Sequence, residues 1–218
     1  MVDLIRGLNV EQLRANLERI RVDVASAANG REVEILAAVK YVPVEQLGVL
    51  AEAGIALVGE NRAQELGRKA DAYPGRFTWD FIGVLQSRKV RDLLPNVRYI
   101  HSVASDSALA QLGRHGSPDT EVLIEVNLAG EEGKSGVAPS ELAAFLDRCP
   151  VRAVGLMTMP PFTDDPERSR PYFRELRRLA ERHGLPHLSM GTSQDYLVAV
   201  QEGATIVRLG TVLYAESV

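Results

Sequence analysis

The sequence has few of the residues that build metal centres and disulfide frameworks. Its 218 residues include one cysteine, Cys149, and four histidines. A single cysteine excludes an internal disulfide and a cysteine-rich metal site. His115, His183 and His187 stand at no metal-like spacing from His101. We therefore predict that the protein has no metal site.

Long apolar runs and an excess of basic charge are also lacking. Charges interrupt the first twenty residues too often for a signal peptide or a membrane-spanning helix. Acidic residues outnumber basic ones by 29 to 25, and the basic ones are spread along the chain, so the sequence has no electrostatic footprint for nucleic acid. We predict a cytoplasmic, monomeric protein that binds neither nucleic acid nor a membrane.

Eight apolar segments of strand length alternate with helical patterns. Continuous apolar strands are typical of a parallel sheet, and eight parallel strands can close into a barrel. No G-x-G-x-x-G motif follows the first strand, which disfavours an open dinucleotide-binding sheet. We predict one α/β domain over residues 1–218, a single (β/α)₈ TIM barrel with an extra N-terminal helix capped by Asn9. The predicted strands cover residues 33–40, 56–61, 78–83, 98–103, 121–128, 151–158, 187–191 and 205–211.

Polar residues gather at the carboxyl ends of these strands, where barrels carry their active sites. Lys40 is the most informative, because it closes an apolar strand and lysine is rarely buried without a partner. Of the other three lysines, Lys69 and Lys89 fall in charged helical patterns and are expected to be solvated, and Lys134 lies in a polar loop. Partial burial of Lys40 would favour the neutral amine that Schiff-base chemistry needs. The alternative is a lysine that pairs with a carboxylate or extends to water.

The ends of the seventh and eighth strands carry a pattern typical of a phosphate site. "LSMGTSQDY" offers Ser193 as an N-cap with free backbone N–H groups behind it, and "RLGT" offers Gly210 and the Thr211 hydroxyl. The alternative is ordinary turn chemistry. A lysine and a phosphate site in one barrel mouth suit a ligand with an aldehyde and a phosphate. Pyridoxal 5′-phosphate is one such ligand, and the substrate of a sugar-phosphate aldolase is another.

Several motifs occur in a fixed order along residues 33–215: "AAVKYVP", "GENRAQE", "FIGVLQSRK", "IHSV", "GEEGKSG", "GLMTM", "LSMGTSQDY" and "VRLGT". Together they resemble the pyridoxal phosphate homeostasis protein family (YggS/PROSC, the proline synthase co-transcribed proteins). That family is similar to the barrel domain of fold-type III enzymes such as alanine racemase. The chain departs from the family pattern at Asp80, where His is usual, and at Thr192, where a hydrophobic residue is common.

The resemblance implies a role for nine residues. Lys40 would form the internal aldimine with pyridoxal phosphate, Arg208 would lie beside the pyridine nitrogen, and Asn61 and Met157 would line the ring. The residues implied around the phosphate are Ser189, Met190, Gly191, Gly210 and Thr211.

The same resemblance bears on whether the protein is an enzyme. An arginine beside the pyridine nitrogen stays cationic and weakens the cofactor as an electron sink. Fold-type III enzymes add a second β domain that supplies a catalytic group, whereas this chain ends at Val218, seven residues after Thr211. Tyr41 should point away from Lys40, its strand neighbour. We assign no catalytic residue and expect a carrier that buffers pyridoxal phosphate and delivers it to apo-enzymes; an amino-acid racemase and an aldolase are the alternatives.

Overall fold

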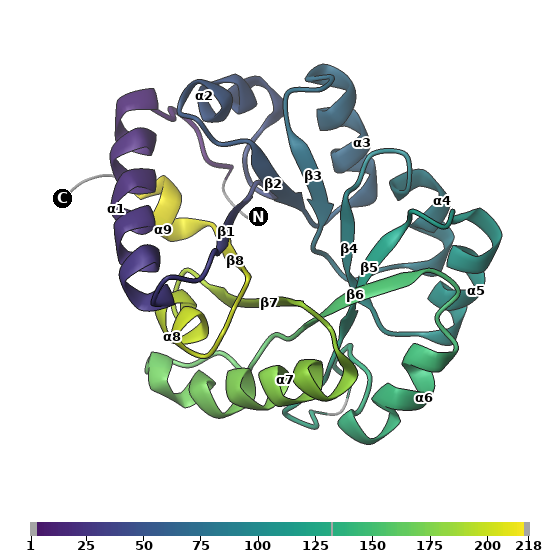
Figure 1. Ribbon diagram of the computed structural model, residues 1–218. Helices are drawn as coiled ribbons and strands as arrows, with labels where there is room; N and C mark the ends of the chain where they lie inside the picture. Colours follow the sequence, from purple (N-terminus) through teal and green to yellow (C-terminus); the bar gives the residue numbers. More distant parts are fainter. Residues whose placement is uncertain (1–3, 132, 216–218) are drawn as a thin grey trace.

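Eight parallel strands close into a barrel in the order in which they occur along the chain (Figure 1). The computed structural model describes residues 4–131 and 133–215, so residues 1–3, 132 and 216–218 of the predicted domain lie outside the described residues. All eight predicted strands are present, which confirms the barrel. The strands are β1 (Glu34–Ala38), β2 (Leu57–Glu60), β3 (Thr78–Phe81), β4 (Tyr99–Val103), β5 (Glu121–Glu125), β6 (Arg152–Met157), β7 (His187–Thr192) and β8 (Ile206–Leu209).

Helices surround the barrel as an outer ring, which Figure 1 shows from one end of the barrel. They are α1 (Val10–Ala28), α2 (Leu47–Glu52), α3 (Ala63–Ala72), α4 (Val90–Leu93), α5 (Asp106–His115), α6 (Leu142–Asp147), α7 (Arg170–His183), α8 (Tyr196–Gln201) and α9 (Thr211–Tyr214). Short 3₁₀ turns lead into several of them, as at Pro139–Glu141 and Pro166–Ser169. None of the helices in the described ranges is both long and apolar enough to cross a membrane.

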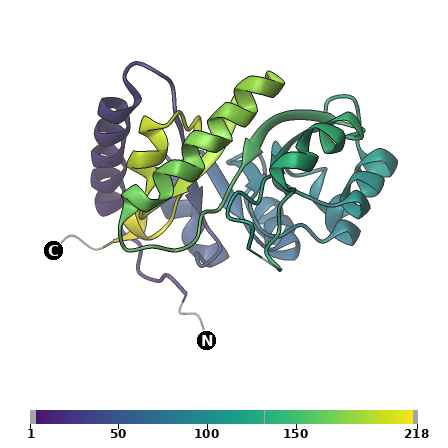
Figure 2. The same cartoon turned by 90° about the horizontal axis from the view of Figure 1, so that it is seen from below.

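The additional helix, α1, is hydrogen-bonded to the segment that follows β8. The Asn9 side chain accepts a hydrogen bond from the Gln12 backbone N–H at 3.0 Å, which confirms the predicted cap. The buried Asn16 amide donates to the carbonyl oxygens of Leu213 (3.0 Å) and Ala215 (2.9 Å). α1 therefore packs beside α8 and α9 on the outside of the barrel, as Figures 1 and 2 show.

Two layers of apolar side chains form the core. The larger layer lies between the helices and the outer face of the strands and includes Ile20, Leu66 and Phe173, all fully buried. The smaller layer fills the barrel interior and consists of Leu36, Tyr99, Leu123, Val154, Met157 and Ile206. Because side chains fill the interior, ligand access is confined to the ends of the barrel.

Six of the eight strands end one to three residues earlier than the sequence predicts, whereas β4 ends as predicted and β7 ends one residue later. β1 ends at Ala38, and the Val42 N–H donates to the Val39 carbonyl oxygen (3.0 Å), which closes a turn around Lys40. The alternation of side chains along a strand therefore no longer applies at Lys40 and Tyr41.

Candidate functional site

A cavity of about 570 Å³ opens at the carboxyl ends of the strands. This volume is within the range of small-molecule sites. Each of the eight strands, or the turn that follows it, contributes to the wall. The residues that line it include Lys40, Tyr41, Asn61, Glu125, Met157, Thr192, Ser193, Arg208, Gly210, Thr211 and Tyr214.

Lys40 lies on the wall of this cavity but is exposed, so the predicted partial burial was wrong. The physical reason is the turn after β1, which carries Lys40 out of the sheet. Its ammonium lies 4.8 Å from the centre of the Tyr41 ring, so Tyr41 also faces the cavity, contrary to the expectation from strand alternation. Among residues 4–131 and 133–215, no carboxylate forms an ion pair with Lys40.

Lys69 is the buried lysine, which corrects the prediction that it is solvated. Its side chain is 2% exposed, and its ammonium donates to Glu60 Oε2 (2.5 Å) and to the Val39 carbonyl oxygen (2.7 Å). The other Glu60 oxygen accepts from the backbone N–H groups of Asn61 (2.7 Å) and Arg62 (3.2 Å). The ion pair thus joins the turn that carries Lys40 to the segment that carries Asn61.

Arg208 is a buried cation that faces the cavity from β8. One terminal nitrogen donates to the Ser189 carbonyl oxygen (2.7 Å) and to the Ser189 hydroxyl, and the other donates to the Thr158 carbonyl oxygen (3.0 Å) and to Met159 Sδ (2.8 Å). Burial lowers the pKa of Arg208 to about 10, with Asp195 and Glu125 opposing this effect. The guanidinium therefore stays charged at neutral pH although neutral groups hold it.

The residues predicted around a phosphate lie at different depths. Gly210 and Thr211 line the cavity, and Gly191 lines a smaller adjoining hollow with Arg208. The Met190 side chain is fully buried in the outer core, so only its backbone could face a ligand. The Ser189 hydroxyl is also fully buried and bonds to Arg208 and His101.

Ser193 does not cap α8 as predicted. The N-cap residue of α8 is Asp195, whose Oδ1 accepts from the Thr192 N–H at 2.7 Å and so folds residues 192–195 into a turn. The Ser193 hydroxyl instead accepts from the N–H groups of Gly210 (3.0 Å) and Val212 (3.3 Å). It thereby connects the loop after β7 to the start of α9.

Two polar atoms of residues that line the cavity lack hydrogen-bond partners among the described residues. They are Asn61 Oδ1 and the Tyr214 hydroxyl oxygen, both buried. Burial raises the pKa of the Tyr214 phenol, and the nearby Glu60 charge adds to the effect. Because buried polar groups are normally satisfied, these two atoms indicate a cavity that fits a polar ligand.

Glu125 is a further lining residue that the sequence reasoning missed. Burial raises the pKa of its carboxyl group, and a hydrogen bond from the Ser135 hydroxyl (2.8 Å) and the charge of Arg208 offset this only in part. The predicted strand extended to residue 128 and so placed Glu125 inside the strand, whereas β5 ends at Glu125 itself. Tyr214 gave no signal because it lies beyond the last strand, on α9.

Within the described ranges, no group of three or more metal-ligating side chains occurs. The loop after β5 carries an ion pair between Glu131 and Lys134. Glu132, in the same loop, lies outside the described residues.

Comparison with known proteins places this barrel in a class. Alanine racemase from Corynebacterium glutamicum superposes with a TM-score of 0.73 at 18% identity over 96% of this chain and 62% of that one. The fold is therefore the barrel of alanine racemase-like proteins. PipY of Synechococcus elongatus, solved with PLP bound, superposes with a TM-score of 0.79 at 28% identity over 93% of this chain and all of that one.

The family follows from sequence. The pyridoxal phosphate homeostasis protein of Aquifex aeolicus is 41% identical over 94% of this chain and 97% of its own length. No family model matches the chain. The chain belongs to the pyridoxal phosphate homeostasis protein family, which confirms the resemblance carried by its motifs.

Proposed function

We propose that this protein binds pyridoxal 5′-phosphate reversibly through Lys40 and buffers it for cellular use. The observation that carries the proposal is the exposed Lys40 amine, which shares one cavity with Arg208 and with two unsatisfied polar atoms. The cofactor supplies an aldehyde that reacts reversibly with a primary amine. PipY, a structural neighbour at 28% identity, was solved with PLP bound, which supports the same ligand here.

Each end of such a ligand has a counterpart on the cavity wall. Gly210 and Thr211 would meet the phosphate, joined by the backbone of residues 189–191. Arg208 would hold the ring nitrogen, and its charge favours the unprotonated ring. Asn61 and Met157 would line the ring, with the Asn61 oxygen free to accept a hydrogen bond. These roles are proposals that the cavity geometry supports.

An enzyme of the amino-acid racemase type is the second candidate. Glu125 favours it, because a buried carboxyl with a raised pKa on a cofactor-sized cavity is a candidate proton donor. Tyr41, which faces the same cavity beside Lys40, is another. We prefer the carrier, which would act as a cytoplasmic monomer and release the cofactor to apo-enzymes.

The test combines spectroscopy with chemical trapping. Pyridoxal phosphate added to the wild type should produce a new absorbance band, and borohydride should then leave the cofactor attached to the peptide that contains Lys40. Lys40→Ala should show neither. Lys89→Ala is the matched control, since Lys89 is a half-buried helix lysine outside the cavity. Loss of attachment in the control, or attachment in Lys40→Ala, would contradict the proposal.

Racemase assays then separate the two candidates. The carrier predicts no isomerisation of an amino acid above the rate of free pyridoxal phosphate. Isomerisation that disappears in both Lys40→Ala and Glu125→Gln would establish the enzyme instead.

A further inference from the structure

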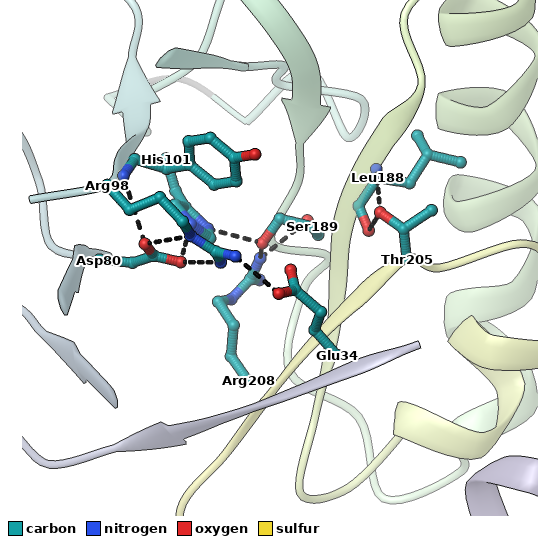
Figure 3. Close-up of polar contacts among 9 residues, drawn as sticks. Glu34, Asp80, Arg98, His101, Leu188, Ser189, Thr205 and Arg208 are labelled. Atoms are coloured by element: carbon teal, nitrogen blue, oxygen red, sulfur yellow. Dashed lines mark hydrogen bonds and ion pairs between the residues drawn. The ribbon is translucent and has the colours of Figure 1, made fainter. Parts of the chain in front are cut away.

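A chain of hydrogen bonds crosses the barrel interior behind Arg208 (Figure 3). The Arg208 guanidinium donates to the Ser189 hydroxyl, His101 Nδ1 lies 2.8 Å from that hydroxyl, and His101 Nε2 lies 3.1 Å from Asp80 Oδ2. Arg98 closes the chain by donating to both Asp80 oxygens at 3.0 and 2.7 Å. The side chains of Ser189, His101 and Asp80 are fully or almost fully buried.

The donors and acceptors allow one direction only. Arg98 and the Tyr99 N–H already donate to Asp80, whose carboxylate can only accept, so His101 Nε2 must carry a proton and donate to it. Arg208 can only donate, so the Ser189 oxygen accepts from it. The Ser189 hydroxyl proton then has one partner, His101 Nδ1, which must be unprotonated.

A neutral imidazole is also what the charges around His101 favour. Burial lowers its pKa, and the charges of Arg208 and Arg98 add to that effect, whereas Asp80 opposes it. A second proton on His101 would leave the Ser189 hydroxyl proton without an acceptor in a fully buried place. The geometry and the surrounding charges therefore agree.

We propose that Ser189, His101 and Asp80 form a directional relay that positions Arg208 toward the ring nitrogen of the ligand. The relay passes part of the negative charge of Asp80 to the Ser189 oxygen without placing a carboxylate against the guanidinium. Arg208 thus stays cationic and fixed in orientation. His101 is a positioning residue, because it does not line the cavity. The role in ligand binding rests on the proposed function.

The first test needs no ligand. ¹⁵N–¹H spectra of the imidazole nitrogens should show His101 as the neutral Nε2–H tautomer at neutral pH. Asp80→Asn replaces a carboxylate, which can only accept hydrogen bonds, with an amide, which can also donate. The imidazole signals of His101 should therefore change in this variant. A doubly protonated or Nδ1–H imidazole in the wild type would overturn the relay, whether or not the protein binds pyridoxal phosphate.

The second test measures ligand binding and compares pyridoxal phosphate with its carbocyclic analogue. His101→Leu breaks the relay, and we expect it to weaken pyridoxal phosphate binding roughly tenfold. The same variant should bind the carbocyclic analogue, in which C–H replaces the ring nitrogen, as the wild type does. His101→Gln, whose amide can accept from Ser189 and donate to Asp80, should restore most of the affinity.

The outcomes are distinguishable. Equal losses for both probes, or no loss for pyridoxal phosphate, would overturn the positioning role. If His101→Leu does not fold, Ser189→Ala tests the same link with a smaller change and the same two probes. If the wild type binds neither probe, the proposed function fails, while the tautomer measurement still decides whether the relay exists.

Discussion

The buried ion pair between Lys69 and Glu60 should be the most sensitive polar contact near the cavity. Lys69→Met removes the ammonium and leaves the Glu60 carboxylate 0% exposed, with only the Asn61 and Arg62 N–H groups as partners. Breaking a buried pair from one side costs about 3–5 kcal/mol of the free energy of unfolding. For a chain of this size that corresponds to a fall in Tm of roughly 6–20 °C.

A second substitution tests the cause. Glu60→Gln in the Lys69→Met background removes the uncompensated charge, while the amide oxygen can still accept from Asn61 or Arg62. The double variant should therefore recover more than half of the loss. Lys89→Met is the matched control, because Lys89 forms only a surface pair with Asp92 at 3.4 Å, worth about 0–1 kcal/mol.

Urea unfolding followed by circular dichroism measures all three variants against the wild type. A loss of less than about 1 kcal/mol in Lys69→Met would refute the prediction, because an unpaired buried charge costs more free energy than that. A double variant as unstable as the single one would refute the assigned cause. In that case the methionine side chain, and not the stranded carboxylate, would be the cause.

Four other predictions follow from single positions. Gly210→Ala should leave the Tm unchanged, because apart from the two neighbouring residues an added Cβ would meet no described atom closer than 3.9 Å. It should weaken pyridoxal phosphate binding in an absorbance titration, because Gly210 lines the cavity at the proposed phosphate site. Gly191→Ala should lower the free energy of unfolding by about 1–3 kcal/mol, since its φ is +91° and an added Cβ would lie 2.6 Å from the Ala199 Cβ; equal stability of the two variants would contradict this contrast. Tyr214→Phe should raise the free energy of unfolding of the ligand-free protein by about 1 kcal/mol, because it removes a buried hydroxyl without a partner, and a loss of stability in urea would refute it. Burial lowers the pKa of His101 below 6.5, so the unfolded chain binds the extra proton first and the wild type should lose stability as the pH falls below about 6.5. The loss is at most about 1.4 kcal/mol per pH unit, and His101→Gln should lack it in urea titrations. Parallel pH profiles of the two proteins would show that His101 does not cause the loss of stability.

The barrel was predictable because its signals are local. Each strand is a predominantly apolar run, and turn residues separate it from a helical pattern. The ends of the strands were less predictable, since hydropathy continues past the last paired residue. The predicted strand over 33–40 includes Lys40, yet hydrogen bonding between strands stops near Val39 and the chain turns.

The depth of Lys69 depends on contacts that the sequence does not reveal. Its neighbours on α3 are charged, which suggested a solvated face, although Leu66 one turn earlier is fully buried and lies on the same side of the helix. The partner, Glu60, belongs to β2, and the second acceptor, the Val39 carbonyl, lies thirty residues away. The three-residue spacing from Leu66 places Lys69 on the buried face of the helix, but it does not reveal which groups accept its hydrogen bonds.

The same contacts explain how an acidic protein can offer a cationic cavity. The chain carries a formal net charge of −4, but Lys40 and Arg208 both face the cavity, and neither is ion-paired to a carboxylate within the described ranges. Lys69 is neutralised by Glu60 outside the cavity, and the charge of Asp80 reaches Arg208 only through His101 and Ser189. Glu125 is the one acidic residue on the described wall, and burial favours its protonated form. The local excess of positive charge suits a phosphate-bearing ligand, and it depends on anions that stabilise the neighbouring structure while staying out of the cavity.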